Sequence, residues 1–354
     1  MSNELVGLKI GASQMTAALI SRNGDASLQS VAAAPLAPGI VVGGEVRDPA
    51  SLGAAMKAFF ASAKFGKKPV RIGVASNRIG VRAVEIDGVE DASQLGNAIR
   101  FRAQEALPIP LDEAVLDYQV LSARKDDDGK PRYQVQFVVA YRDLVDGFVQ
   151  AARAADVDLI GVDLDAFALL RALAPLGAPA DAENASAVVA VAVGAERSTI
   201  AVSNGLICEF TRVLEWGGRM MTDALVEQLS VAAADAENLK IAVGLAGDVA
   251  DESIDAEQAA RVREILNEGV ATFARELVAS LQFYQSQSSS LGIGEILLAG
   301  GSARLEGFAE ALSEMVGVGV RVGDPFANLG ATKKGATFEH DPALSIAIGL
   351  GLGQ

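Results

Sequence analysis

The chain has 354 residues, a formal net charge of −15 and a hydrophobic content of 50%. This length allows about two domains with large cores, and the acidity excludes a general nucleic-acid binder, which needs a basic face. The longest apolar runs have about half of the roughly 20 residues that a membrane span requires, and the chain does not open with a basic segment followed by an apolar core. We therefore expect a cytoplasmic protein without direct membrane insertion and without a nucleic-acid partner.

The first half of the chain alternates predicted strands and helices. Apolar runs bounded by glycine or polar turns predict strands at 5–10, 16–21, 27–33, 70–76, 80–87 and 157–165, and a hairpin at 115–141 with the turn DDDGKP. Helical periodicity predicts helices over 49–65, 91–107, 142–156 and from 166. The segment 174–186, rich in proline and alanine, is the expected boundary between the two halves.

The second half opens as the first does. Residues 185–213 predict three strands, and when they are laid against the start of the chain, Gly194 falls on Gly11 and Thr199 on Thr16. This correspondence favours an internal duplication, and chance similarity of two alternating apolar hairpins is the alternative. The remaining predictions are helices over 217–242, 256–288 and 305–317, strands at 295–301 and 320–325, and a closing helix from 342. Two similar halves of this kind predict an α/β protein with two lobes and a cleft between them.

Three glycine turns follow predicted strands, at 9–13, 192–196 and 297–303. Such turns can present backbone N–H groups to a phosphate, although the chain has no Walker A and no G-x-G-x-x-G motif. A magnesium ion beside the phosphate would require a carboxylate, and Lys9 holds the position where one would sit most naturally. The single cysteine, Cys208, and the single histidine, His340, form no cluster with metal-ligand spacing, so no metal site is expected.

Four longer stretches carry a family resemblance: PGIVVGGEVRDPASL (38–52), IRFRAQEALPIPLDEAVLDYQVL (99–121), VDLDAFALLRAL (162–173) and LLAGGSARLEGFAEAL (297–312). Over nearly its whole length the sequence resembles the type IV pilus assembly protein PilM family, cytoplasmic relatives of the cell-division protein FtsA in the actin-like ATPase superfamily. The resemblance implies an actin-like (ribonuclease H-like) two-lobed α/β fold with duplicated βββαβα halves and an inserted FtsA-type 1C subdomain. The implied subdomains are 1A at 1–77, 161–186 and 340–354, 1C at 78–160, 2A at 187–219 and 291–339, and 2B at 220–290.

The sequence departs from that family where a magnesium ion would be held. The family has an Asp in each duplicated hairpin where this chain has Lys9 and Ala192, and its Glu-Pro pair is Asp165-Ala166 here. Because phosphoryl transfer depends on a bridging metal, the resemblance implies a degenerate ATPase site without catalytic residues or magnesium. We expect no cofactor there, or weakly bound ATP or ADP. Lys9 itself can pair with a phosphate, pair with a local carboxylate or reach solvent.

Other features of a nucleotide site persist by resemblance. Thr16 stands where the family commonly has a lysine, which weakens one phosphate contact. Glu237 and Lys240 match a Glu-x-x-Lys segment that flanks the adenosine and share one face of a helix, with a surface ion pair as the alternative. The full set of candidates is Gly11, Ala12, Ser13, Thr16, Gly194, Ala195, Ser198, Gly217, Gly218, Glu237, Lys240, Gly300, Gly301 and Ser302.

The resemblance also implies a protein partner. This is the N-terminal cytoplasmic tail of a PilN-like inner-membrane protein, bound as an extended peptide in a groove beside the inserted module. A peptide of this kind can add as a strand to an exposed sheet edge, and Arg100, Arg102 and Arg124 supply local positive charge. The candidate contact residues are Ile99, Phe101, Leu107, Ile109, Leu111 and Tyr118. Core packing is the alternative for any one of them.

These features predict a scaffold at the inner face of the cytoplasmic membrane. It would be attached through the PilN-like protein, have little or no ATPase activity, and have the pilus assembly ATPases as possible further partners. Two alternatives stay open: an ATP-binding and ATP-hydrolysing actin-like switch of the same machinery, and an FtsA-like filament-forming protein. The final segment, IGLGLGQ, resembles a packed helix more than an amphipathic membrane helix, which disfavours a close FtsA role.

Overall fold

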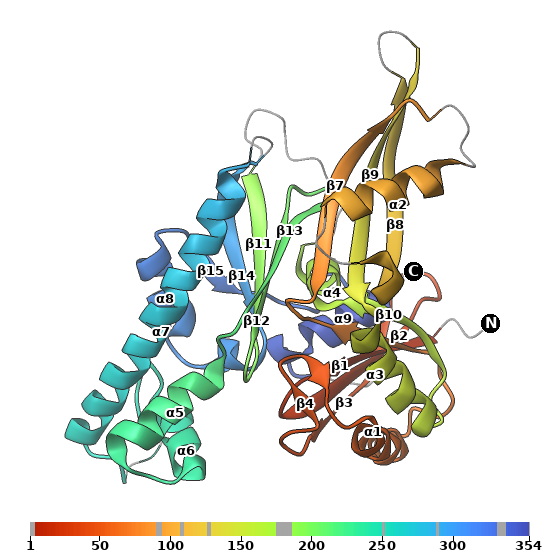
Figure 1. The fold of residues 1–354 in the computed structure, drawn as a ribbon. Helices are drawn as coiled ribbons and strands as arrows, with labels where there is room; N and C mark the ends of the chain where they lie inside the picture. The colour runs from red at the N-terminus through yellow and green to blue at the C-terminus, as the bar shows by residue number, and fades with distance from the viewer. Residues whose placement is uncertain are drawn as a thin grey trace.

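The structure, a computed structural model, describes residues 4–89, 94–106, 110–125, 129–174, 186–249, 251, 253–287, 290–330 and 338–353. Two five-stranded sheets form the centres of two lobes, and a three-stranded sheet extends beyond the first lobe (Figure 1). Two helices, α4 (Asp165–Leu173) and α9 (Ser345–Leu352), lie between the five-stranded sheets (Figure 1). The predicted two-lobed α/β fold is confirmed.

The two large sheets have the same construction. The first contains β1 (Glu4–Ile10), β2 (Gln14–Ser21), β3 (Ser27–Pro35), β6 (Val70–Val74) and β10 (Leu159–Leu164) in the order β10-β6-β1-β2-β3. The second contains β11 (Ser186–Val193), β12 (Ser198–Ser203), β13 (Cys208–Leu214), β14 (Gly292–Ala299) and β15 (Val320–Val322) in the order β13-β12-β11-β14-β15. Lys9 faces Thr16 across the first hairpin as Ala192 faces Thr199 across the second. This shared register confirms the duplication.

Helices cover both faces of the first sheet because its central strand is apolar on both sides. Side chains alternate along a strand, so Val6 and Leu8 point into a core with α1 (Pro49–Ala63) and α3 (Arg142–Ala154). Gly7 points the other way, toward α9, where a Cβ would lie 2.0 Å from the carbonyl oxygen of Ala347. The short hairpin of β4 (Val41–Val42) and β5 (Glu45–Val46) lies beside α1 and α3 in this lobe (Figure 1).

The helices between the sheets pack closely because their facing residues are small. A Cβ on Gly349 of α9 would lie 1.8 Å from the carbonyl oxygen of Ala168 in α4. Alanines of α4 also pack against alanines of β11, β12 and β14 in one buried cluster. The short helix η4 (Pro342–Leu344) leads into α9, and the carbonyl of Pro342 accepts a hydrogen bond from the Gly300 N–H at 3.0 Å. The two lobes therefore meet through tightly packed backbone.

The inserted module is a separate packing unit. Its sheet contains β7 (Ile79–Asp87), β8 (Ala114–Lys125) and β9 (Pro131–Tyr141) in the order β7-β9-β8, with η2 (Leu111–Glu113) before β8. The helix α2 (Leu95–Ala106) covers one face and shares a small core with the sheet. The expected 1C region ran to residue 160, but α3 buries Leu144 and Phe148 in the first lobe and β10 joins the first sheet. The module therefore ends near Tyr141, and the other subdomain limits stay predictions.

A further group of helices belongs to the second lobe. They are α5 (Gly218–Leu229), α6 (Ala233–Val243), α7 (Ala256–Gln285) and α8 (Phe308–Val316), with η3 (Gly301–Arg304) after β14. The single helix predicted over 217–242 is wrong, because Ser230 has a left-handed φ of 53° and ends α5 before α6 begins. In the described part of the chain, no helix has the length and apolarity needed to cross a membrane.

Candidate functional site

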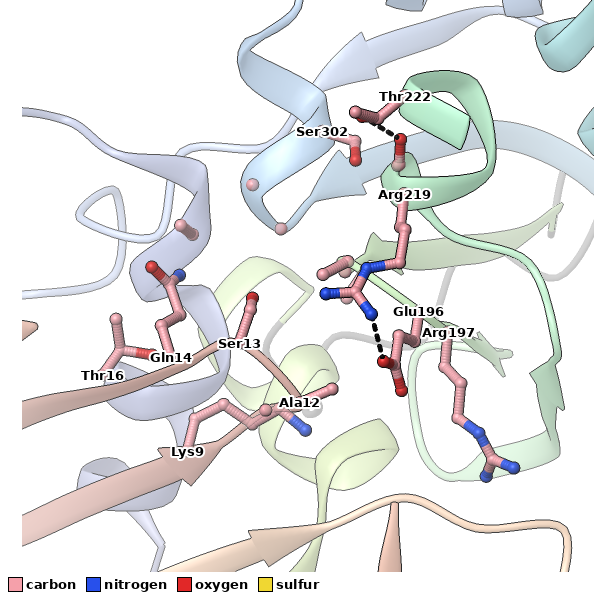
Figure 2. A pocket seen from close by; sticks show the side chains of 18 of the residues that line it. Lys9, Ala12, Ser13, Gln14, Thr16, Glu196, Arg197, Arg219, Thr222 and Ser302 are labelled. Carbon is pink, nitrogen blue, oxygen red and sulfur yellow. Dashed lines mark hydrogen bonds and ion pairs between the residues drawn. The ribbon is translucent and has the colours of Figure 1, made fainter. Parts of the chain in front are cut away.

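A cavity of about 950 Å³ lies where the glycine turns of the two lobes face each other (Figure 2). Its walls are the β1–β2 turn, the β11–β12 turn, the start of α5 and the start of η3. The predicted residues that line it are Lys9, Gly11, Ala12, Ser13, Thr16, Asp165, Ala192, Gly194, Ala195, Gly218, Glu237, Lys240, Gly300, Gly301 and Ser302. The structure brings these residues together, and their contact with a nucleotide stays a prediction.

Two predicted residues lie behind the cavity wall. Ser198 is completely buried, and its hydroxyl donates a hydrogen bond to the carbonyl oxygen of Trp216 at 2.7 Å. Gly217 packs against the second turn, where a Cβ would lie 2.5 Å from the carbonyl oxygen of Ala195. Both residues therefore shape the wall instead of facing the cavity, which corrects the prediction for them.

The two hairpin turns have the same geometry. The N–H of Gly11 donates to the carbonyl of Gln14, and the N–H of Gly194 donates to the carbonyl of Arg197, each at 2.9 Å. The late turn requires glycine for a different reason. Gly300 has φ 86°, and a Cβ there would lie 2.4 Å from the carbonyl oxygen of Val193. The glycines thus let three backbone segments converge on one cavity.

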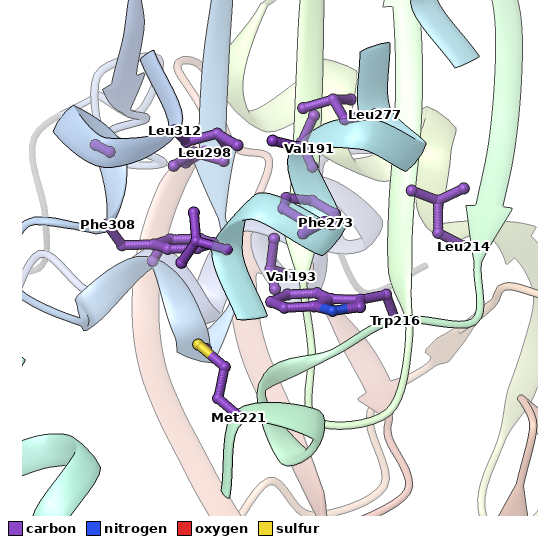
Figure 3. Close-up of a cluster of buried hydrophobic side chains, with 14 of the residues drawn as sticks. Val191, Val193, Leu214, Trp216, Met221, Phe273, Leu277, Leu298, Phe308 and Leu312 are labelled. Atoms are coloured by element: carbon purple, nitrogen blue, oxygen red, sulfur yellow. The ribbon is translucent and has the colours of Figure 1, made fainter. Parts of the chain in front are cut away.

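A stack of aromatic side chains lies behind the part of the cavity wall formed by the start of α5. Trp216 lies against Phe273 of α7 with ring centroids 4.5 Å apart, and Phe273 lies against Phe308 of α8 at 6.2 Å (Figure 3). Met221 of α5 packs into the same buried cluster (Figure 3). Because Trp216 directly precedes Gly217 in the chain, this core sets where α5 begins at the cavity.

Lys9 forms an ion pair with Asp165 at the base of the cavity. Of the alternatives for Lys9, the structure therefore selects the local carboxylate. Asp165 is the first residue of α4 and is 1% exposed, whereas the Lys9 side chain is 24% exposed. Burial raises the pKa of Asp165 above its usual range, and the Lys9 ammonium lowers it only in part. Gly73 leaves room for this carboxylate, since a Cβ there would lie 2.3 Å from its Oδ1.

The residues at this position do not fit a divalent cation. The two strand ends present Lys9 and Ala192, and the carboxylate of Asp165 is occupied by the ammonium. Magnesium requires oxygen ligands, and no group of three or more His, Cys, Asp or Glu residues that could hold a metal occurs among the described residues. We therefore derive no chemical step through a metal ion.

Lys240 belongs to an internal network and not to a surface ion pair. It is 8% exposed, and its ammonium donates to the carbonyl of Gly218 at 3.2 Å, to Thr222 Oγ1 at 2.8 Å and to Glu237 Oε2 at 2.6 Å. Burial raises the pKa of Glu237, but hydrogen bonds from Lys240 and Thr222 outweigh it and hold the pKa below its usual range. Two of the three N–H groups of Lys240 thus join α6 to α5, and the third donates to Glu237 within α6.

Sequence reasoning missed several charged residues of the cavity. Arg219 extends across it from the start of α5 and pairs with Glu196 of the second turn at 3.1 Å (Figure 2). Arg197 pairs with Glu215, and Arg304 pairs with Asp341. A charged residue directly after a glycine turn was the available signal, as in Gly194-Ala195-Glu196 and Gly217-Gly218-Arg219. Each cation that lines the cavity therefore has a carboxylate partner within the described chain.

The predicted partner residues separate into different environments. Ile99 is completely buried in the core of the module, so the alternative of core packing applies to it and the predicted peptide contact is wrong. Phe101 on α2 is 61% exposed and Tyr118 on β8 is 44% exposed. Leu107 and Ile109 lie outside the described residues, and Leu111 begins η2.

Known proteins with a similar sequence or fold are actin-like. Cell division protein FtsA of Escherichia coli strain K12 is 24% identical over 288 residues, which cover 75% of this chain and 66% of that protein. The chain thus spans slightly less than two thirds of the length of this relative. MreB5 of Spiroplasma citri bound to ADP has a TM-score of 0.58 and 10% identity, over 99% of this chain and 96% of that one. These likenesses show the fold.

Two further matches are closer to pilus assembly. A chain of a PilM–PilN type IV pilus biogenesis complex has a TM-score of 0.81 and 24% identity, and the match covers 99% of this chain and 98% of that one. The family model described as type IV pilus assembly protein PilM matches residues 7–354. The chain therefore belongs to the type IV pilus assembly protein PilM family.

Proposed function

We propose that the protein is a scaffold of the type IV pilus inner-membrane assembly platform that binds the cytoplasmic tail of a PilN-like membrane protein. Family membership supports this proposal, as does the likeness to a chain solved in a PilM–PilN complex. Binding to such a tail would hold the protein at the inner face of the membrane without a spanning helix of its own. Pilus assembly ATPases are proposed as further partners of the same platform.

The observation that carries the proposal is an edge strand of the inserted module, β8, which among the described residues pairs with a strand on one side only. The sheet order β7-β9-β8 leaves β8 as a 12-residue edge strand, and Tyr118 and Val120 on one of its faces are 44% and 39% exposed. The other edge strand, β7, lies beside β13 of the second lobe (Figure 1). An extended peptide can add to a free edge through main-chain hydrogen bonds, with apolar side chains supplying specificity.

A peptide titration tests this proposal. A synthetic PilN-like N-terminal peptide should bind in calorimetry, and Phe101→Ala and Tyr118→Ala should each weaken binding by about tenfold or more if these rings are anchors. Phe283→Ala is the matched control, because Phe283 is 58% exposed but lies on α7 of the second lobe. Equal affinities for all three variants and the unmodified protein would move the binding surface away from β8 and α2.

The cavity supports scaffolding over hydrolysis. Loss of a single transition-state contact can cost about 3 kcal/mol, and here both strand-end carboxylates are replaced, by Lys9 and Ala192. We expect no magnesium-dependent ATP hydrolysis above background. A phosphate-release assay with and without magnesium chloride tests this, and turnover that requires magnesium would favour the alternative, an ATP-hydrolysing switch.

A further inference from the structure

The ammonium of Lys9 lies at the base of the cavity, where the duplicated hairpins converge. Lys9 and Ala192 occupy corresponding positions at the ends of β1 and β11, opposite Thr16 and Thr199. Asp165 lies beneath Lys9 with 1% exposure, and its Oδ1 has no hydrogen-bond partner in the described part of the chain. A buried carboxylate so close to a phosphate would repel it, and the Lys9 ammonium cancels that charge.

The Lys9 ammonium can donate further hydrogen bonds besides the one to Asp165. An ammonium has three N–H groups, and within the described residues Lys9 donates one hydrogen bond, to Asp165. Its side chain is 24% exposed and lines the cavity, close to the turn that carries Ala12 (Figure 2). Two N–H groups can therefore reach a ligand that enters from the cavity.

Arg219 is a second cation with capacity to exchange its partner. Its guanidinium lies in the middle of the cavity between Ser13 and Glu196 (Figure 2). The pair with Glu196 is partly exposed, at 45% and 28%, and exposed pairs contribute little to stability. Arg219 can thus leave Glu196 for a stronger anion at small cost.

The other cations of the cavity are less available. Lys240 is 8% exposed and donates to three acceptors. Arg197 turns toward the β4–β5 hairpin, where its Nη2 would lie 2.9 Å from a Cβ on Gly43. Arg304 lines the cavity from η3, but its Nε and Nη2 both donate to Asp341. The cations that point toward the middle of the cavity are therefore Lys9 and Arg219 (Figure 2).

We infer that the cavity binds the phosphates of a nucleoside diphosphate or triphosphate without a divalent cation, with the Lys9 ammonium in place of the metal and Arg219 as the second cation. The N–H groups of Gly11, Gly194 and Gly300 are used in backbone hydrogen bonds, so the backbone N–H groups that a phosphate would meet are those of the residues that follow these glycines in the turns. A tethered ammonium is a compact point charge that suits a phosphate oxygen. This inference goes beyond the proposed scaffold function and does not require the partner peptide.

Calorimetry with ADP, with pyrophosphate and with adenosine tests the inference. Each is titrated into the full chain in EDTA and again in excess magnesium chloride. We expect ADP to bind in EDTA, to bind no more tightly with magnesium, and to bind more tightly than adenosine. Binding of ADP only in magnesium, absence of ADP binding in EDTA, or equal affinity for ADP and adenosine would each overturn the inference.

Two variants test the roles of Arg219 and Lys9 in ADP binding. Arg219→Ala should weaken ADP binding in EDTA by roughly 10- to 100-fold, the effect of losing a charged hydrogen bond. Arg261→Ala is the matched control, since Arg261 is 49% exposed on α7 and pairs with Glu264 outside the cavity lining. The double variant Lys9→Met with Asp165→Asn removes the base pair without leaving a buried charge and should also weaken ADP binding. Unchanged ADP affinity in either cavity variant would overturn the assigned roles.

Measuring ADP binding and peptide binding on the same protein preparation distinguishes a failure of this inference from a failure of the proposed function. A chain that binds the PilN-like peptide but no ADP in EDTA contradicts the metal-free site and leaves the scaffold standing. A chain that binds ADP in EDTA but not the peptide contradicts the proposed scaffold function and leaves the metal-free phosphate site standing.

Discussion

Replacing Lys9 by methionine should destabilise the protein strongly at neutral pH and much less at acidic pH. Lys9 is the hydrogen-bond partner of Asp165, a carboxylate with 1% exposure whose other oxygen has no partner among the described residues. Methionine keeps an unbranched apolar side chain as far as the Cε position and removes the ammonium. Breaking a buried ion pair by removing one partner typically costs about 3–5 kcal/mol, because the remaining charge is uncompensated.

The pH dependence follows from the direction of the pKa shift. Burial raises the pKa of Asp165 in the folded protein above its ordinary value, and Lys9→Met removes the cation that opposes this rise. Between the unfolded and folded pKa values, the folded chain binds more protons than the unfolded chain. The free energy of unfolding of the variant therefore rises as pH falls, by about 1.4 kcal/mol for each pH unit within that window.

Urea unfolding at pH 7.5 and pH 5.5 measures this effect. Circular dichroism follows both lobes, whereas Trp216, the only tryptophan, reports on the second lobe. The deficit of Lys9→Met relative to the unmodified chain should be smaller at pH 5.5 than at pH 7.5. Asp165→Asn should cost less, because the Lys9 side chain that it leaves is 24% exposed and its ammonium can be hydrated from the cavity. A deficit of the same size at both pH values would refute a buried, titrating carboxylate as its cause.

Further predictions concern the metal, the crossing helices and the α5–α6 network. Lys9→Asp combined with Ala192→Asp should create affinity for magnesium with ADP in calorimetry, and an unchanged affinity would contradict the equivalence of the two strand ends. Gly349→Ala should lower the free energy of unfolding by about 3 kcal/mol, whereas Gly319→Ala, with nothing within 4 Å of its added Cβ, should stay within about 0.5 kcal/mol. Lys240→Met should cost about 1–3 kcal/mol by leaving buried acceptors unpaired, and a neutral result in urea unfolding would contradict its place in the network.

Most of the secondary structure could be predicted because its signals are local. The alternating apolar hairpins and their glycine turns are visible in the sequence, and the correspondence of Gly194 with Gly11 holds in the register of the strands. The split between α5 and α6 was missed because one residue, Ser230, takes a left-handed conformation that its type does not announce. The extent of the module was overestimated because α3 follows β9 directly but packs elsewhere.

The chemistry of the cavity was harder to predict because it depends on contacts between distant residues. Lys9 and Asp165 are 156 positions apart, so the sequence offered the lysine several partners and could not select one. Ile99 and Phe101 stand two positions apart on α2, yet one is buried and the other is 61% exposed. An apolar residue near the border of a helix face has no local signal that distinguishes these outcomes.

Several side-chain hydrogen bonds connect the first lobe and the inserted module directly to the second lobe. Asn77, after β6, donates to Glu215 Oε1 of the second lobe at 2.9 Å, and Arg197 reaches the same carboxylate. Gln136 of the module donates to the carbonyl of Cys208 in β13. Because these contacts are all internal to the chain, a ligand in the cavity would have to act against them to move the lobes.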